Sequence, residues 1–213
     1  LYAWTLFTMI RTSFYSALLI LFTSLALNAA PRLGTDFGML DSPIPVKKDG
    51  KVEVVEAFWY GCGHCYSFEP TIERWSAGLS DDVVFSKLPV TWGPFHQTHA
   101  KLFYTIEALG LGEAGHRAVF TAIHKEGNNL GSDSAIISFL QKLGATKEDI
   151  VRQMNSFFVR QKTKRAIELT RQLKVTSVPM MFVDGKYRVE AQRSNDYMLE
   201  IVDHLVGLQK EES

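Results

Sequence analysis

One stretch of the sequence decides the fold: Val52-Glu53-Val54-Val55-Glu56-Ala57-Phe58-Trp59-Tyr60-Gly61-Cys62-Gly63-His64-Cys65. Its first part, residues 52–58, is rich in valine and mostly apolar, which is typical of a central strand buried on both faces. Beyond the cysteines, Phe68, Ile72 and Trp75 recur at helical spacing. The pattern therefore predicts a strand that leads directly into a helix, with two cysteines at the junction.

Strand and helix patterns alternate along the rest of the chain. Residues 83–89 form a second predicted strand, and a right-handed β-α-β connection would place it parallel to the first. Residues 97–173 contain no convincing strand pattern and several helical ones. Strands resume at residues 180–183, and an Asp-Gly hairpin signal follows at 184–185 before a last amphipathic helix. We expect an α/β fold that is interrupted by a block of helices.

The composition is that of an ordinary soluble globular protein. Apolar residues make up 46% and charged residues 22% of the 213 residues. The 23 Lys and Arg side chains balance the 23 Asp and Glu side chains, so no strong net field points to nucleic acid or to an anionic membrane. We therefore expect no nucleic-acid partner.

The chain contains two cysteines, Cys62 and Cys65. A disulfide between them would close a loop too short to constrain the unfolded chain, which argues against a structural bridge. A zinc site would need two more ligands, and His96 and His99 are distant in sequence, so we expect no metal. These histidines either line a surface beside the cysteines or are solvated loop side chains. Tyr66, rather than a histidine, follows the second cysteine, which excludes a c-type haem motif.

A Cys-x-x-Cys pair at the start of a helix is suited to thiol–disulfide exchange. Cys62 lies where unpaired N–H groups and the helix dipole stabilise a thiolate, so its pKa should be low. Cys65 lies one turn further on the same face, more buried, and would resolve a mixed disulfide. A protonated or hydrogen-bonding His64 would stabilise the thiolate further, which makes the disulfide a better oxidant. Gly63 loosens the start of the helix.

Two further residues fit the redox interpretation, and each has an alternative. Glu56 lies inside the apolar strand, six residues before Cys62. It is either a buried acid that exchanges a proton with Cys65 or an acid at the edge, because strand alternation does not fix its direction. Pro179 follows Val178 just before the third strand. It is either a boundary marker or a cis-proline beside the cysteines, with backbone free to pair with an extended substrate.

The N-terminal residues have the pattern of a secretory signal peptide. Arg11 precedes an apolar stretch that ends on small residues. We expect cleavage after Ala29, so that residues 1–29 are the signal peptide and the protein is exported; an uncleaved membrane anchor is the alternative. Residues 1–8, which precede Met9, are interpreted as an over-extended start.

The stretch that ends in Cys62-Gly63-His64-Cys65, followed by Phe68-Glu69-Pro70, resembles the DsbA family of bacterial periplasmic thiol–disulfide oxidoreductases. The resemblance extends over nearly the whole chain after residue 29. It implies a thioredoxin fold with an inserted all-helical domain. The thioredoxin-like domain would then consist of residues 30–96 and 174–213, and the insertion of residues 97–173.

The resemblance also implies roles for individual residues. Cys62 would be the nucleophile, Cys65 the resolving thiol and Glu56 the buried acid. Pro179 would be the cis-proline of the family's Val–cis-Pro pair. Gly63 departs from the family, because many members have Cys-Pro-His-Cys, whereas Cys-Gly-His-Cys also occurs in protein disulfide isomerases.

The implied activity is the introduction of disulfide bonds into secreted proteins in the periplasm, through Cys62 and Cys65. The implied partners are reduced secreted proteins and a DsbB-like membrane oxidase coupled to quinone, and no dissolved cofactor is needed. Two alternatives stay open. One is a disulfide isomerase or reductase on the same scaffold, and the other is a peptide-binding chaperone whose cysteines are incidental.

Overall fold

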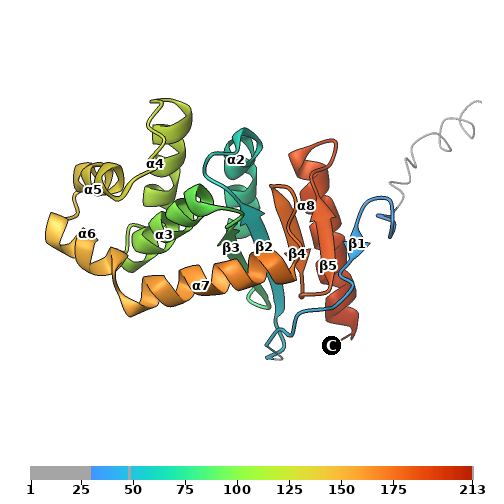
Figure 1. The fold of residues 1–213 in the computed structure, drawn as a ribbon. Helices are drawn as coiled ribbons and strands as arrows, with labels where there is room; N and C mark the ends of the chain where they lie inside the picture. Colours follow the sequence, from blue (N-terminus) through green and yellow to red (C-terminus); the bar gives the residue numbers. More distant parts are fainter. Residues whose placement is uncertain (1–29, 48, 213) are drawn as a thin grey trace, which may run out of the picture. The chain divides into compact units, whose positions relative to one another are not determined.

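A mixed five-stranded sheet organises residues 30–47 and 49–212, which the computed structural model describes (Figure 1). The strand order is β1-β5-β4-β2-β3. The strands are β1 (Gly38–Met39), β2 (Val52–Phe58), β3 (Val83–Pro89), β4 (Met180–Val183) and β5 (Tyr187–Glu190). The predicted signal peptide, residues 1–29, lies outside the described residues.

Strand β2 lies in the interior of this sheet, as its apolar sequence predicts. It pairs in parallel with β3 on one side and antiparallel with β4 on the other. The register sets Glu56 of β2 opposite Lys87 of β3, so the two side chains lie next to each other on one face of the sheet. The predicted β-α-β unit is confirmed.

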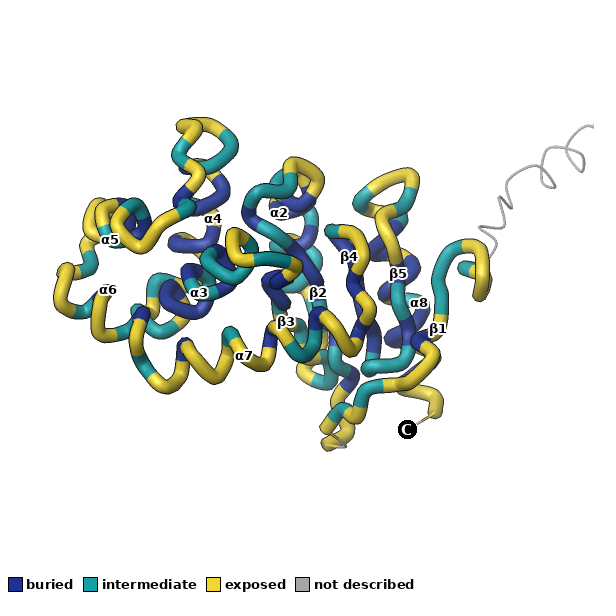
Figure 2. The backbone as a smooth tube through the Cα atoms, viewed as in Figure 1, coloured by how far each residue is buried: buried dark blue, intermediate teal, exposed yellow. Residues whose placement is uncertain are grey.

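Helices cover both faces of the sheet. The apolar side chains of α2 (Gly63–Ala77) and α8 (Asn195–Glu212) form one core with β2, β4 and β5. Side chains of α3 (Pro94–Ala108) and α7 (Phe157–Gln172) share a second core with the opposite face. Figure 2 shows the central strands buried and much of α7 exposed. The sheet is therefore the middle layer of three.

The block between β3 and β4 is helical, as the sequence predicts. Within the described residues it consists of α3, α4 (Gly112–His124), α5 (Asp133–Lys142), α6 (Lys147–Met154) and α7. Side chains of α3 to α6 form a third core together with the end of β2 and with Cys65. The cysteine pair therefore lies where the sheet meets the helical block.

The β4–β5 hairpin was predicted and the strand β1 was not. Asp184 and Gly185 form the turn with φ of 51° and 59°, and a Cβ at Gly185 would collide with the carbonyl oxygen of Ile44. β1 pairs with β5 and has two residues. A strand of this length is too short for a periodic pattern in the sequence to reveal it. None of the described helices has both the length and the apolar character that a membrane span requires.

Candidate active site

Cys62 is the N-cap residue of α2. Its backbone is extended, with φ −87° and ψ 116°, and its Sγ lies 3.2 Å from the backbone N–H of Cys65. Gly63 begins the helix, and a Cβ placed there would have no atom within 4 Å. The sulfur therefore occupies the position that a capping serine or aspartate oxygen fills in other helices.

This position stabilises the Cys62 thiolate. A hydrogen bond from the Cys65 thiol is the largest cause that lowers the pKa of Cys62, from 9.0 to about 6, against the opposing effect of burial. The backbone N–H groups of Cys65 and His64 lower the pKa further. The charge of His64, which is exposed, contributes less than these hydrogen bonds.

Cys65 has the opposite environment. Its side chain is fully buried and packs in the core that also contains Phe58 and Tyr60. Burial, followed by the hydrogen bond to Cys62, raises the pKa of the Cys65 thiol far above its ordinary value. One sulfur of the pair is thus a partly exposed thiolate and the other a buried, protonated thiol.

The free energy of unfolding of the reduced protein should depend on this thiolate. Because the folded pKa of Cys62 is about 6 and its ordinary value is 9.0, the thiolate stabilises the reduced fold at higher pH, and this contribution is lost as the pH falls through 6. The oxidised protein has no such thiolate. We expect the reduced form to lose stability relative to the oxidised form as the pH falls from about 9 to about 6 in urea titrations. An unchanged difference would contradict the lowered pKa.

The loop before β4 lies against Cys62. The peptide bond between Val178 and Pro179 is cis, and the Cys62 thiol lies 3.5 Å from the carbonyl oxygen of Val178. Of the two alternatives for Pro179, the structure has the cis-proline beside the cysteines. The peptide groups next to the reactive sulfur therefore come from residues more than a hundred positions away in the sequence.

Glu56, on the strand that precedes the cysteines, is fully buried, so the alternative of an edge-facing acid is wrong. Its Oε2 lies 3.5 Å from Nζ of Lys87, and neither carboxylate oxygen has a hydrogen-bond partner among the described residues. Burial raises the pKa of Glu56 to about 8, although the charge of Lys87 opposes the shift. Glu56 in turn helps to raise the pKa of Cys65.

Known proteins that are similar in sequence to this chain are thiol:disulfide interchange proteins. The chain is 41% identical over 175 residues to the thiol:disulfide interchange protein DsbA of Pseudomonas aeruginosa, which is 81% of this chain and 83% of that protein. The chain belongs to the DsbA family. The DsbA protein of Azotobacter vinelandii is 37% identical over 177 residues, covering 82% of this chain and 83% of its own length. The model of the family described as DSBA-like thioredoxin domain matches residues 85–202.

Solved DsbA structures confirm the fold class. The crystal structure of Pseudomonas aeruginosa DsbA superposes with a TM-score of 0.81 at 39% identity, covering 85% of this chain and 95% of that one. The DsbA of Xylella fastidiosa gives a TM-score of 0.80 at 26% identity. The fold is a thioredoxin fold with inserted helices, and this DsbA-family chain is a thiol–disulfide oxidoreductase.

Several buried polar residues of this DsbA-family chain lie near the cysteines and were not predicted from the sequence. Lys87 donates to both carboxylate oxygens of Glu69 at 2.8 Å. Nε2 of His116 lies 3.2 Å from Oε1 of Glu69, and its Nδ1 lies 2.8 Å from the Tyr60 hydroxyl. Glu69 is four residues after Cys65 on the same helix face, which is a signal that could have revealed it. His116 comes from the helical block, and no local pattern indicates it.

A second group of side chains surrounds Trp59, which precedes the cysteine pair. His99, which one alternative treated as a solvated loop residue, is 1% exposed on α3. It accepts a hydrogen bond at 3.0 Å from Nε1 of Trp59 and contacts the carbonyl oxygen of Asn129 at 2.9 Å. The ring of His96 lies 4.6 Å from that of Trp59. The two histidines therefore anchor the tryptophan that precedes the cysteines.

The side chains near the cysteines are poorly suited to bind a metal ion. Among the described residues, Glu69, Glu113 and His116 bring potential ligand atoms within 4.8 Å of one another. Both oxygens of Glu69, however, already accept hydrogen bonds from the Lys87 ammonium. A protein cation thus neutralises the carboxylate that a metal would need.

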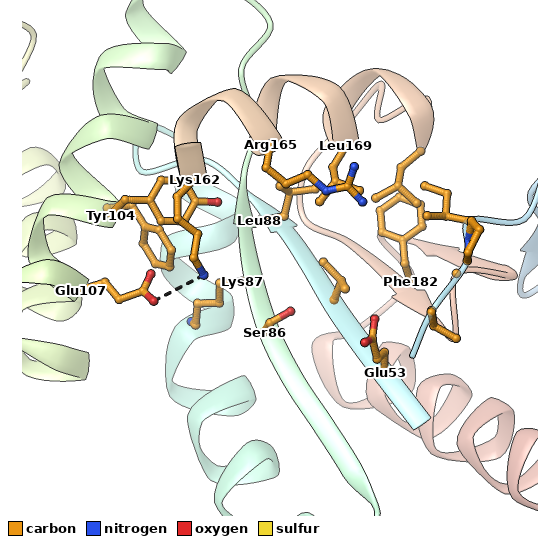
Figure 3. A pocket seen from close by; sticks show the side chains of 17 residues that line it. Glu53, Ser86, Lys87, Leu88, Tyr104, Glu107, Lys162, Arg165, Leu169 and Phe182 are labelled. Atoms are coloured by element: carbon orange, nitrogen blue, oxygen red, sulfur yellow. Dashed lines mark ion pairs between the residues drawn. The ribbon is translucent and has the colours of Figure 1, made fainter. Parts of the chain in front are cut away.

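The cavity in Figure 3 is a separate feature of the DsbA fold. It has a volume of about 420 Å³ and lies between the strands β2 and β3 and the helices α3 and α7. Lys162 and Glu107 form an ion pair of 3.6 Å at its rim, and Leu88 and Phe182 are part of its apolar wall. Neither cysteine lines it, so it does not contribute to the exchange site.

Proposed function

We propose that this oxidoreductase works in the oxidising direction and introduces disulfide bonds into reduced secreted proteins through Cys62 and Cys65. The observation that supports this direction is the position of Cys62 at the start of α2, where the N–H of Cys65 lies 3.2 Å from its sulfur. Hydrogen bonds and the helix dipole stabilise the thiolate. A stabilised thiolate favours the reduced protein, so its disulfide is a strong acceptor of electrons.

The proposed reaction has two exchange steps. A substrate thiolate attacks Sγ of Cys62 in the oxidised protein, the Cys62–Cys65 bond breaks, and the Cys65 sulfur leaves and takes a proton from Glu56. A second substrate thiolate then attacks the substrate sulfur of the mixed disulfide, and Cys62 leaves as a thiolate. The substrate dithiol is oxidised to a disulfide and the enzyme disulfide is reduced to a dithiol.

The remaining residues of the site would position the substrate. Val178 and Pro179 offer backbone next to Cys62, and an extended substrate segment could pair with it as an added strand. Gly63 is exposed beside the reactive sulfur, where the absence of a side chain leaves room for the substrate. His64 adds a polar ring at the exposed end of the helix and favours the thiolate.

Location and partners follow from the same proposal. Residues 1–29 would be a signal peptide that exports the protein to the periplasm, an oxidising compartment. The redox-active disulfide serves in place of a dissolved cofactor. A DsbB-like, quinone-linked membrane oxidase would restore the disulfide after each turnover.

We also propose a division of the exported chain into two domains. The thioredoxin-like domain would comprise residues 30–96 and 174–213, and the helical domain residues 97–173. The core that the side chains of α4, α5 and α6 form supports this division, and it meets the thioredoxin-like part at α3, the end of β2 and Cys65. Helices α3 and α7 connect the two parts because their side chains also pack on the sheet.

The redox state of the protein in cells tests the direction. We expect thiol-trapping in cell extracts to find the Cys62–Cys65 disulfide predominantly formed, and to find it reduced when the quinone-linked oxidase is absent. Mostly reduced protein in wild-type cells would instead favour the isomerase or reductase, an alternative that the Cys-Gly-His-Cys sequence supports.

A further inference from the structure

Five buried polar side chains form a continuous chain behind Cys65. They are Glu56 on β2, Lys87 on β3, Glu69 on α2, His116 on α4 and Tyr60, which follows β2. The four that can carry a charge have side chains at most 6% exposed, and Tyr60 is fully buried. The reaction proposed above uses only the first of them.

Two carboxylates among these five side chains, those of Glu56 and Glu69, compete for the ammonium group of Lys87. Nζ of Lys87 lies 2.8 Å from each oxygen of Glu69, but 3.5 Å from the nearest oxygen of Glu56. Neither oxygen of Glu56 makes a hydrogen bond within the described residues. A buried carboxyl group without such partners favours its neutral form, whereas a carboxylate with a bidentate ammonium favours its charged form.

His116 adds a second partner to Glu69. Nε2 of His116 lies 3.2 Å from Oε1 of Glu69, which is an ion-pair distance without the geometry of a hydrogen bond, and Nδ1 lies 2.8 Å from the Tyr60 hydroxyl. The rings of Phe58 and Phe120 pack around the imidazole, with centroids 5.2 Å and 5.1 Å away. The imidazole is therefore held in one place, with its Nε2 beside the carboxylate of Glu69.

We propose that His116 is a positioning residue that keeps the negative charge of the buried acid pair on Glu69, and so leaves Glu56 protonated for transfer of its proton to Cys65. The inference rests on the proposed function. With His116 present, the ammonium group of Lys87 remains paired with the carboxylate of Glu69. Without it, the charge on Glu69 loses a polar neighbour at 3.2 Å, Lys87 is freer to pair with Glu56, and Glu56 ionises more readily.

The proton balance is simple. When the Cys62–Cys65 bond breaks, the electron pair goes to the Cys65 sulfur, and the proton of the Glu56 carboxyl moves to that sulfur. Glu56 is left as a carboxylate next to Lys87 until solvent returns a proton. If Glu56 were already ionised, the buried Cys65 thiolate would have no internal acid to neutralise it, and the first exchange step would slow.

The charges of two neighbouring carboxylates also keep Glu56 protonated, and the charge of Lys87 opposes them. Glu113, exposed on α4, brings a carboxylate oxygen within 4.8 Å of the ligand atoms of Glu69 and His116. Its charge opposes ionisation of Glu56, as does that of Glu69. Lys87 is the cation nearest to the acid pair, and from α3 the apolar ring of Phe103 packs on the imidazole.

Carboxyl NMR titration of the reduced full-length mature protein tests the inference, with assignment by Glu56→Gln and Glu69→Gln. In the wild type we expect Glu56 to titrate near pH 8 and Glu69 below 4.5. In His116→Phe, the midpoint of Glu56 should fall by about one pH unit or more, because Lys87 becomes available to it. His116→Gln keeps an N–H donor and should restore the wild-type order.

His124→Phe is the matched control. Nε2 of His124 contacts the carbonyl oxygen of Tyr60 at 2.8 Å but does not contact the acid pair, so the variant should leave the Glu56 midpoint unchanged. An unchanged midpoint in His116→Phe would overturn the inference. If that variant does not fold, the titration of the wild-type protein tests the inference. A titration midpoint of Glu56 below that of Glu69 would also overturn it. Neither result depends on the redox state in cells, so the proposed direction can fail separately.

Discussion

Replacing Cys62 with alanine is expected to reduce the oxidation of a dithiol peptide to its uncatalysed rate. Cys62 is the partly exposed sulfur with the lowered pKa, and the fully buried Cys65 cannot take its place. Without Cys62 no mixed disulfide with substrate can form. The measurement is the rate of disulfide formation in a model peptide with two cysteines, in the presence of an oxidant that regenerates the enzyme.

Cys65→Ala is the matched control for this variant. It keeps the attacking sulfur and removes the resolving one, so we expect mixed disulfides with substrate to accumulate on Cys62 and to be visible by non-reducing electrophoresis. An unchanged rate of peptide oxidation by the Cys62→Ala variant would contradict the exchange mechanism. That result would favour the chaperone alternative, in which the cysteines are incidental.

Replacing Lys87 with methionine should lower the free energy of unfolding by about 3–5 kcal/mol. The side chain of Lys87 is 6% exposed and neutralises Glu69 through two hydrogen bonds of 2.8 Å. Its removal leaves a buried carboxylate without a counter-charge, which is more costly than the loss of a favourable contact. Urea unfolding of the reduced protein at neutral pH measures the change.

An exposed ion pair provides the comparison. Lys101 donates to Asp133 at 3.1 Å with side chains 27% and 63% exposed, so Lys101→Met should cost about 0–1 kcal/mol. The double variant Lys87→Met, Glu69→Gln should recover part of the loss, because the unpaired charge is gone. A Lys87→Met variant as stable as Lys101→Met would contradict the assignment of Glu69 as a buried, ionised partner.

The junction between β2 and α2 could be predicted because its determinants are local. The apolar strand, the glycine-rich turn and the helical spacing after it are all within about two dozen residues. They indicate where Cys62 and Cys65 lie relative to the helix start and therefore which sulfur is activated. Glu56 could be singled out because an acid inside an apolar strand conflicts with its surroundings.

The supporting residues could not be predicted, since they meet only through tertiary packing. Lys87 reaches Glu56 through the register of a parallel strand pair, which the sequence alone does not specify. His116 approaches Glu69 because α4 packs beside α2, a contact between segments that are separated by a strand and a helix. His99 likewise contacts the carbonyl oxygen of Asn129, thirty residues further along the chain.

The ionisation of Cys62 in the reduced protein decides whether this sulfur is an activated nucleophile. The ultraviolet absorbance of the thiolate, followed as a function of pH, should show a transition with a midpoint near pH 6 that disappears in Cys62→Ala. Such a midpoint would mean that Cys62 is an activated nucleophile at neutral pH. A midpoint near 9.0, the ordinary value of a cysteine thiol, would mean that the helix start does not activate Cys62.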